Sequence, residues 1–190
     1  MTFSPQTGDH MRHAFKHLNR FMVLMFRLGL GPWLQFWPRV TGQILVLVHR
    51  GRKSGLLRRT PLNFARADGD IYILAGFGRA SDWYRNLRAD RQGEVWLPDG
   101  WWSVEAEEVS DHPERLRLLR AVLVGSGFAA YAFGVSPGLP DERLAQITSG
   151  YRLVRLRLVG PRTGPGGPGD LAWVWPAALT LRLLLRRRRR

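Results

Sequence analysis

A short basic segment in the first half of the chain has the composition of an anion-binding site. Residues 51–55 read Gly-Arg-Lys-Ser-Gly, and Arg58 and Arg59 follow closely. A loop with two glycines can present backbone amides, and arginine binds phosphate and carboxylate groups through paired hydrogen bonds. The segment is not a Walker loop, because Arg52 stands directly before Lys53, where that motif requires glycine. It therefore predicts either an anion site or an ordinary basic hairpin.

A second segment offers groups that suit a planar ring. Residues 76–78 read Gly-Phe-Gly, and residues 82–87 read Asp-Trp-Tyr-Arg-Asn-Leu. Flexible backbone lies here close in sequence to the flat indole of Trp83 and the hydrogen-bonding amide of Asn86. These residue types are suited to framing a planar heterocycle.

Taken in order, the basic turn, the Arg-Arg-Thr-Pro-Leu string at 58–62 and the Trp-Tyr-Arg-Asn-Leu string at 83–87 resemble the deazaflavin-dependent nitroreductase family, over roughly residues 40–110. The resemblance implies a split β-barrel that binds the deazaflavin F420. It also implies hydride transfer to a quinone, a nitro compound or another lipophilic, electron-poor acceptor. FMN is the alternative cofactor. A hypothesis from a different class is a non-catalytic carrier of an anionic or lipophilic ligand at a membrane surface.

The resemblance also implies which side chains contact the cofactor. The expected contacts are Arg52, Lys53, Ser54 and Arg58 to its anionic part, Thr60 and Pro61 along its rings, and Gly76, Arg79, Trp83 and Asn86 beside them. Family members often carry Ser-Lys-Gly-Gly before the tryptophan, whereas residues 76–79 here read Gly-Phe-Gly-Arg. The lysine contact is therefore either missing or taken over by Arg79.

The acceptor pocket has one candidate residue. Tyrosines in the last third of the chain commonly line that pocket in the family, and Tyr131 is the candidate here, with packing as the other interpretation. Reduced deazaflavin supplies the hydride itself, so the protein needs to position the donor, exclude water and polarise an oxygen. No acid–base pair is required and no certain catalytic residue is assigned. Glu105, Glu107 and Glu108 are expected at a solvated strand end.

Composition limits the class of protein and of partner. The 190 residues include 29 Lys and Arg against 15 Asp and Glu, and the net charge of +14 implies an anionic partner. The absence of cysteine excludes disulfides, thiolate zinc sites and cysteine nucleophiles. His10, His13 and His17 share a helical face without a following carboxylate, so we expect a polar edge and no metal site. No nucleic-acid partner is expected, because no recognised nucleic-acid fold accompanies the charge.

The elements that position these residues follow from hydrophobic periodicity. Expected strands cover residues 44–48, 57–66, 71–74, 95–97, 101–109 and 151–159, and expected helices run from 11 to about 28, over 82–90, 111–124 and 141–148. The fold class is α+β, a split β-barrel of about six antiparallel strands with flanking helices. Pro61 requires an edge or a bulge, Ser81 is a helix cap, and the Asp-His-Pro-Glu string at 111–114 is a helix start.

We expect three parts along the chain. Residues 1–40 hold an amphipathic helix and an aromatic elbow, 41–160 the barrel, and 161–190 a flexible Gly/Pro linker and a hydrophobic tail that ends in arginines. The elbow residues Trp33, Phe36 and Trp37 can pack on the core or lie at a lipid boundary.

The apolar run 171–185 would form a helix of about 22 Å, short against roughly 30 Å of hydrocarbon. It is expected to contact lipid, the alternatives being docking on the barrel or disorder. Without a signal-peptide pattern, we expect a cytoplasmic protein at the inner face of the cell membrane, with an anionic membrane surface as a partner and an oligomer possible.

Overall fold

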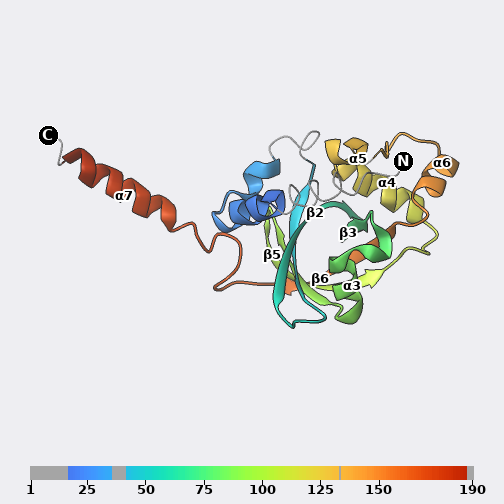
Figure 1. Ribbon diagram of the computed structural model, residues 1–190, viewed down its shortest axis with the longest axis horizontal. Helices are drawn as coiled ribbons and strands as arrows, with labels where there is room; N and C mark the ends of the chain where they lie inside the picture. Colours follow the sequence, from blue (N-terminus) through green and yellow to red (C-terminus); the bar gives the residue numbers. More distant parts are fainter. Residues whose placement is uncertain (1–16, 36–41, 133, 188–190) are drawn as a thin grey trace, which may run out of the picture.

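The computed structural model describes residues 17–35, 42–132 and 134–187. A closed barrel of six antiparallel strands forms its centre (Figure 1), in the order β1-β2-β3-β6-β5-β4. The strands are β1 (Ile44–Arg50), β2 (Leu57–Ala67), β3 (Asp70–Ala75), β4 (Gln92–Leu97), β5 (Gly100–Glu108) and β6 (Arg152–Pro161). The α+β class and the six-stranded barrel are confirmed.

Strand β2 accommodates its proline at an unpaired edge. Its residues 57–63 pair with β1, with Pro61 opposite Val46, whereas only residues 64–67 pair with β3. Proline has no N–H to donate to a ladder, so it is tolerated where one side of the strand has no neighbour. The expected edge position of Pro61 is confirmed.

Strand β1 is buried on both faces. Leu45 and Leu47 point into the barrel, while Val46 and Val48 pack outside it with Phe26. Alternation along a strand sends successive side chains to opposite faces, so a strand covered on both sides is apolar throughout. A helix over residues 17–27 supplies the outer cover.

The N-terminal helix differs in part from its predicted pattern. Leu18 and Phe26 are both apolar residues of the predicted amphipathic helix, but Leu18 is 50% exposed, whereas Phe26 is buried. Trp33 belongs to the 3-10 helix η1 (Gly31–Gln35) and is 68% exposed, so it is not a core residue. The predicted helix start at Met11, the residues His10 and His13, and the elbow residues Phe36 and Trp37 lie outside the described residues.

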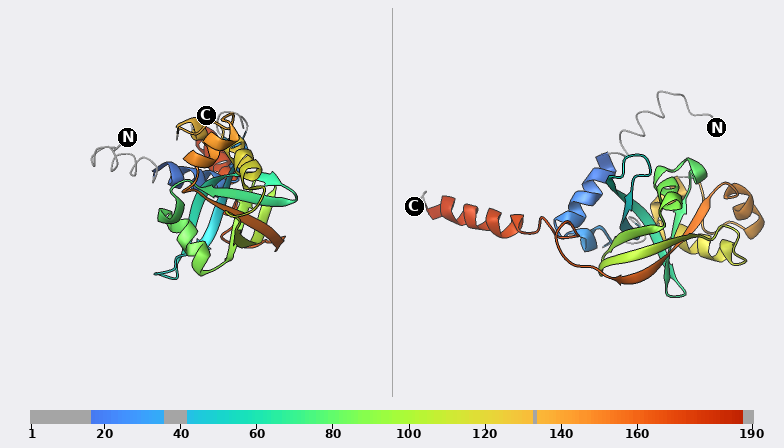
Figure 2. Two further views of the ribbon diagram at one scale, coloured as in Figure 1. Left: turned by 90° about the vertical axis from the view of Figure 1, so that its right-hand side faces the viewer. Right: turned by 90° about the horizontal axis from the view of Figure 1, so that it is seen from below.

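Helices cover the barrel in two groups (Figures 1 and 2). α4 (Arg115–Gly125), α5 (Phe128–Ala132) and α6 (Asp141–Ile147) lie together at the opposite end from the helix over 17–27. Leu118 and Val122 of α4 pack on Tyr72 and Leu153 of the barrel wall. Between β3 and β4, η2 (Gly78–Ala80) leads into α3 (Asp82–Ala89).

One predicted helix start is confirmed and another is wrong: α3 begins at Asp82, directly after Ser81, as expected. Ser81 is the N-cap residue of α3, but its side chain makes no capping hydrogen bond. Helix α4 begins at Arg115, so the predicted start at residue 111 is wrong. The His112 ring accepts the Glu114 N–H through Nδ1 at 3.1 Å, and the Arg115 N–H bonds to the His112 carbonyl, so 111–114 form a turn.

The segment after β6 is attached to the barrel, contrary to the flexible linker that its glycines and prolines predicted. The N–H of Gly169 donates to the Phe26 carbonyl and that of Leu171 to the Arg27 carbonyl, each at 2.9 Å. Gly167 lies so close to Trp101 that an added Cβ would be 2.4 Å from the ring. Tertiary hydrogen bonds therefore order a segment whose composition suggests freedom.

Helix α7 (Val174–Arg187) then projects away from the barrel (Figures 1 and 2). Its first turn is held by the Trp175 indole, which donates to the Leu28 carbonyl at 3.0 Å. Among the helices of the described residues, none has both the length and the apolar character needed to cross a bilayer.

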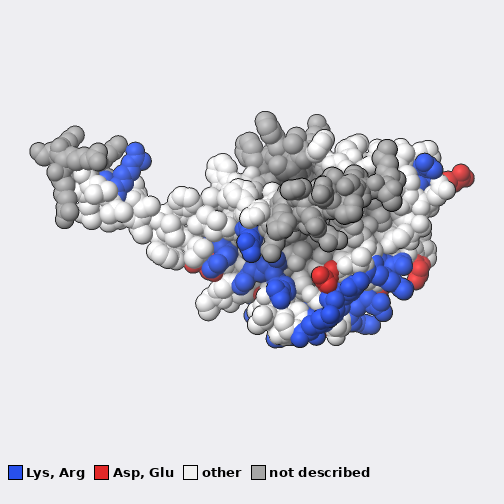
Figure 3. Space-filling model, viewed as in Figure 1, with Lys and Arg blue, Asp and Glu red and all other residues white. Residues whose placement is uncertain are grey.

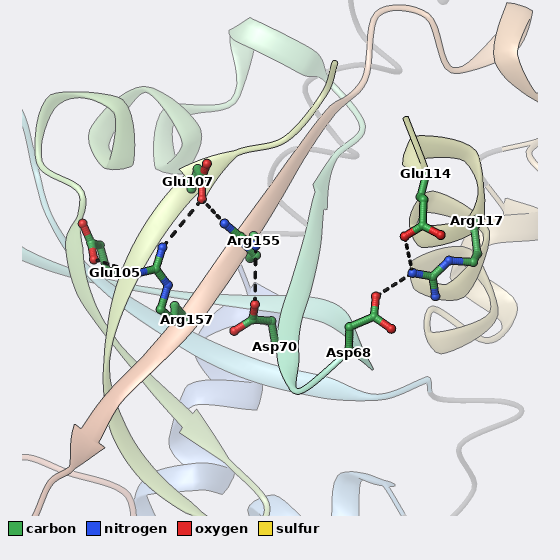
Figure 4. A network of polar contacts seen from close by, with 8 residues as sticks. All are labelled: Asp68, Asp70, Glu105, Glu107, Glu114, Arg117, Arg155 and Arg157. Atoms are coloured by element: carbon green, nitrogen blue, oxygen red, sulfur yellow. Dashed lines mark hydrogen bonds and ion pairs between the residues drawn. The ribbon is translucent and has the colours of Figure 1, made fainter. Parts of the chain in front are cut away.

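The carboxylates expected at a solvated strand end lie at the end of β5, where Glu107 and Glu108 are exposed. They also form ion pairs across the barrel surface (Figure 4). Arg155 of β6 contacts Glu107 of β5 and Asp70 of β3, and Arg157 lies 3.9 Å from Glu105. Glu108 lies 3.7 Å from the guanidinium of Arg152. Cross-strand ion pairs of this kind contribute to sheet pairing. Glu107 and Glu108 also line a second, smaller cavity, where the Tyr84 hydroxyl donates to Glu108.

Candidate functional site

A cavity of about 540 Å³ opens between the β1–β2 turn and α3. The residues that line it are His49, Gly51, Arg52, Lys53, Ser54, Arg58, Thr60, Asp82, Trp83 and Asn86. Small-molecule sites commonly enclose about 300 to 1,000 Å³. The volume therefore suits a ligand of cofactor size.

Seven of the predicted cofactor contacts line this one cavity, and four other predicted site residues do not. The seven are Arg52, Lys53, Ser54, Arg58, Thr60, Trp83 and Asn86. The four outside it are Pro61, Gly76, Arg79 and Tyr131. Arg79 is exposed in η2, and Tyr131 is 57% exposed on α5. Contact with a cofactor stays a prediction for all of them.

The backbone of the basic turn is already hydrogen-bonded within the protein. The Gly55 N–H donates to the Gly51 carbonyl at 2.8 Å, and Gly55 adopts φ of +67°, which favours glycine. The Gly51 N–H bonds to the Leu56 carbonyl, and the Arg52 N–H to the Asn86 side chain. The expectation that this turn offers its amides to an anion is therefore wrong for these three groups.

Strand alternation decides which arginines of β2 face the cavity. Arg58 and Thr60 are two residues apart, so they share a face, and both line the cavity. Arg59 lies on the other face, where its guanidinium is 5.2 Å from the Trp96 ring centroid and donates to the Gly166 carbonyl. Arg58 thus converges on the turn as expected, and Arg59 does not.

Helix α3 contributes an aromatic ring and a buried amide. Trp83 and Asn86 are three residues apart, a spacing that places them on one helix face. Trp83 is half-buried and packs against the barrel core, and Asn86 is 6% exposed. The helix therefore presents a fixed flat wall to the cavity.

A chain of hydrogen bonds joins the turn, α3 and both strands. Arg52 donates from Nη1 to Asn86 Oδ1 at 2.9 Å, and Asn86 Nδ2 lies 3.2 Å from His49 Nδ1. His49 Nε2 lies 3.1 Å from Thr60 Oγ1. His49 is 3% exposed, and burial lowers its pKa to about 4, with the nearby Arg58 charge acting in the same direction. The ring is therefore neutral near pH 7.

The cations at the cavity are unequally neutralised. Arg52 also contacts Asp82 at 3.1 Å, and that carboxylate is 80% exposed. In the part of the chain that the structure describes, no carboxylate lies within 4.0 Å of Lys53 or of Arg58. Figure 3 shows a band of Lys and Arg side chains across the face on which α3 lies. Lys53 and Arg58 are thus positioned to bind an external anion.

Three residues that line the cavity were not among the predicted cofactor contacts: His49, Gly51 and Asp82. The signal for His49 was present, because Leu45, Leu47 and His49 alternate along β1 and a polar group at the third inward position is unusual. Asp82 begins α3, and nothing in its local sequence indicated that Arg52 lies beside it.

Residues 20–141 match the family described as F420H(2)-dependent quinone reductase. An F420H(2)-dependent quinone reductase of Mycobacterium tuberculosis is 35% identical over 83 residues, which cover 41% of this chain and 55% of that protein. A putative F420H(2)-dependent quinone reductase of Mycobacterium bovis matches with the same values. The chain thus spans about half the length of these curated relatives, 55% in each case.

Two solved structures are similar to part of this chain. A conserved hypothetical protein of Mycobacterium tuberculosis is 22% identical, with a TM-score of 0.45 over 67% of this chain and 86% of that one. An F420-H2 dependent reductase is 19% identical, with a TM-score of 0.44 over 60% of this chain and 94% of that one.

Proposed function

The chain belongs to the F420H(2)-dependent quinone reductase family, and we propose that it transfers a hydride from reduced F420 to a lipophilic, electron-poor acceptor such as a quinone or a nitro compound. The observation that carries the proposal is that two cations without a carboxylate partner line the same cavity as a flat aromatic ring. Lys53 and Arg58 line the same cavity as the half-buried ring of Trp83. A cavity of this kind suits a ligand with an anionic part and a planar part.

The residues present fit such a cofactor. Lys53 and Arg58 supply donors for its anionic groups, and Ser54 adds a hydroxyl beside Arg58, whose Nη2 lies 3.4 Å from Ser54 Oγ. Trp83 and Thr60 border the space for the ring system. Both ends of the Asn86 amide are already engaged, so Asn86 supports the wall and is not the main polar contact.

Reduced F420, when bound, supplies the hydride and the accompanying proton that together convert a quinone to a hydroquinone. The protein then has to orient the ring, exclude water and present a donor to it. The cavity agrees with this division, because its ionisable groups other than cations are limited to His49 and Asp82. His49 is neutral, and Asp82 is exposed and paired with Arg52.

Fluorescence titration with F420 tests the proposal. We expect a saturable change in deazaflavin fluorescence at micromolar cofactor, and no change at such concentrations would overturn it. Purified protein that is yellow, or that binds FMN in place of F420, would indicate the flavin alternative. Binding of F420 without oxidation of its reduced form in the presence of a quinone would indicate a carrier.

We also propose that α7 brings the cavity to the inner face of the cell membrane. Leu179, Leu181, Leu184 and Leu185 of this helix are each more than 50% exposed, and the sequence continues into arginines at 186–190. A short apolar helix beside a cluster of arginines suits the interface of an anionic leaflet, where the arginines contact headgroups. A lipophilic acceptor would be concentrated in the same place.

A further inference from the structure

We propose that His49 is a positioning residue that makes the Thr60 hydroxyl a hydrogen-bond donor toward the cavity. In this proposal His49 does not transfer a proton to or from the ligand. It acts by orienting the Thr60 hydroxyl. The identity of the ligand rests on the function proposed above, whereas the direction of the hydrogen bonds rests on the protein alone. The consequence is a preference in recognition: the Thr60 hydroxyl can donate its hydrogen to an acceptor atom of the ligand.

The direction of the hydrogen bonds from Arg52 to Thr60 is set at Arg52. Its backbone N–H and its guanidinium Nη1 both approach the same Asn86 side-chain atom, at 3.2 and 2.9 Å. An arginine guanidinium has donors and no acceptor, so this Asn86 atom must be the carbonyl oxygen Oδ1. The two donors thereby exclude the flipped amide, and the NH₂ group of Asn86 faces His49.

The next step decides the tautomer of His49. The Asn86 Nδ2 group can only donate, and it lies 3.2 Å from His49 Nδ1, so Nδ1 must carry a lone pair. A neutral imidazole has one N–H, which is then on Nε2. His49 Nε2 therefore donates to Thr60 Oγ1, 3.1 Å away.

The last step concerns the remaining hydrogen of Thr60. Its oxygen accepts from His49, so its own hydrogen must point elsewhere. Within the described ranges, no other hydrogen bond is made by this hydroxyl, and Thr60 is half-buried at the cavity wall. The hydroxyl hydrogen is thus available to the cavity. A carbonyl oxygen or an unprotonated ring nitrogen of a ligand satisfies it, whereas an N–H group does not.

Burial keeps the His49 ring neutral, and the direction of the hydrogen bonds depends on that neutral form. His49 is 3% exposed, and its burial disfavours the charged ring, as does the positive charge of Arg58. A hydrogen bond with the Arg50 backbone and the charge of Asp82 act in the opposite direction but are outweighed. With a pKa of about 4, about one ring in a thousand is protonated at pH 7. Protonation would put a donor on Nδ1 against the donor of Asn86, so the neutral ring and the hydrogen-bond direction support each other.

Nuclear magnetic resonance of the ligand-free protein tests the tautomer directly. Long-range ¹H–¹⁵N spectra of the histidine rings, with His49 assigned from the His49→Gln variant, report which nitrogen carries the hydrogen. We expect an unprotonated Nδ1 and a protonated Nε2 at pH 7. A protonated Nδ1 would reverse the direction of these hydrogen bonds and make Thr60 a donor to His49. That result would overturn the proposal whatever the cofactor is.

Binding measurements then test the role of the hydroxyl. Removing it in Thr60→Val is expected to weaken F420 binding about three- to tenfold, the range of one hydrogen bond, and Thr60→Ser is expected to retain most of the affinity. His49→Leu should weaken binding by a similar factor, and the double variant by no more than either alone. His49→Gln keeps an amide donor for Thr60 and is expected to restore affinity.

A matched control separates this role from packing. Thr148 is fully buried and donates to the Leu144 carbonyl, and it does not line the cavity. Thr148→Val should lower stability without changing the F420 dissociation constant. Additive losses in the double variant, or equal losses in His49→Gln and His49→Leu, would show that His49 does not act through Thr60. Failure of wild type to bind either F420 or FMN would overturn the proposed function, and the ring spectra would still decide the hydrogen-bond direction.

Discussion

The guanidinium of Arg27 pairs with the carboxylate of Asp170, joining two residues 143 positions apart. Arg27 Nε lies 3.0 and 3.1 Å from the two carboxylate oxygens, and Nη2 lies 2.8 Å from one of them. The pair raises the pKa of Arg27, chiefly through the hydrogen bond to Asp170. It attaches the chain that follows β6 to the helix over 17–27, beside the point where α7 leaves the barrel.

This attachment predicts that two truncated chains will differ in their free energy of unfolding. Deleting 176–190 leaves Asp170 and the Trp175 indole in place, so the free energy of unfolding should be unchanged. Deleting 162–190 removes Asp170 and the hydrogen bonds to the Phe26 and Arg27 carbonyls, uncovers Trp101, and should lower that free energy by on the order of 2 kcal/mol. Urea unfolding measures both. Equal stability of the two truncated chains would show that the contacts after β6 contribute nothing.

Lys53 and Arg58 are expected to bind the anionic part of F420. Lys53→Ala and Arg58→Ala should each weaken binding by about 1.5 kcal/mol, the lower end for a charged hydrogen bond, because both side chains are exposed. Added salt should reduce the difference from wild type. Arg143→Ala is the control, since Arg143 is an exposed arginine of α6 whose Nη1 bonds to Gln146. Unchanged affinity in both cavity variants would remove the turn from the site.

Asp82 is expected to oppose an anionic ligand. Its carboxylate contacts Arg52 at 3.1 Å and is 80% exposed at the cavity. Asp82→Asn should therefore tighten F420 binding about two- to fivefold, because a negative charge is removed and Arg52 keeps its bond to Asn86. Asp141→Asn removes a carboxylate of similar exposure that contacts Arg120 and should have no effect. Weaker binding in Asp82→Asn would mean that Asp82 serves chiefly to orient Arg52.

His49 predicts a pH dependence of stability. Its pKa is about 4 in the folded protein, against about 6.5 in an unfolded chain. Between these values the unfolded chain binds a proton that the folded one does not, so stability is full above about pH 6.5 and falls as the pH drops toward 4. The loss from this group is at most about 3 kcal/mol.

Urea unfolding at pH 7, 6 and 5 measures this dependence. Wild type should lose more stability over that range than His49→Gln, whose side chain does not titrate. His112→Gln, at a histidine away from the cavity, should keep the wild-type slope. Parallel curves for wild type and His49→Gln would contradict the depressed pKa.

The proposed membrane contact predicts a selective loss of vesicle binding. Leu181→Asp combined with Leu184→Asp should reduce partition onto vesicles that contain phosphatidylglycerol by more than tenfold, since each buried leucine contributes about 1.5 to 3 kcal/mol. The F420 dissociation constant should not change. Val159→Asp alters an exposed apolar residue of β6 and is the control. Equal partition of all three proteins would exclude α7 as the contact.

Local patterns in the sequence determined most of the barrel. Short apolar segments separated by turn residues located all six strands, and the edge position of Pro61 followed from its missing N–H. The basic turn and the tryptophan of α3 were both predicted to contact a cofactor, and they line one cavity. These features depend on residue type and on spacing within a few positions, which is the information that a single sequence carries.

Contacts between distant segments were decided only by the tertiary structure. Closure of the barrel brings Arg52 to Asn86, 34 residues away, and their bond leaves Arg52 only partly available to a ligand. The same closure buries His49 between Asn86 and Thr60, and docking of Asp170 on Arg27 orders a glycine-rich segment that looked flexible. Periodicity describes each element alone, whereas the state of a buried polar group depends on which partners the other elements bring to it.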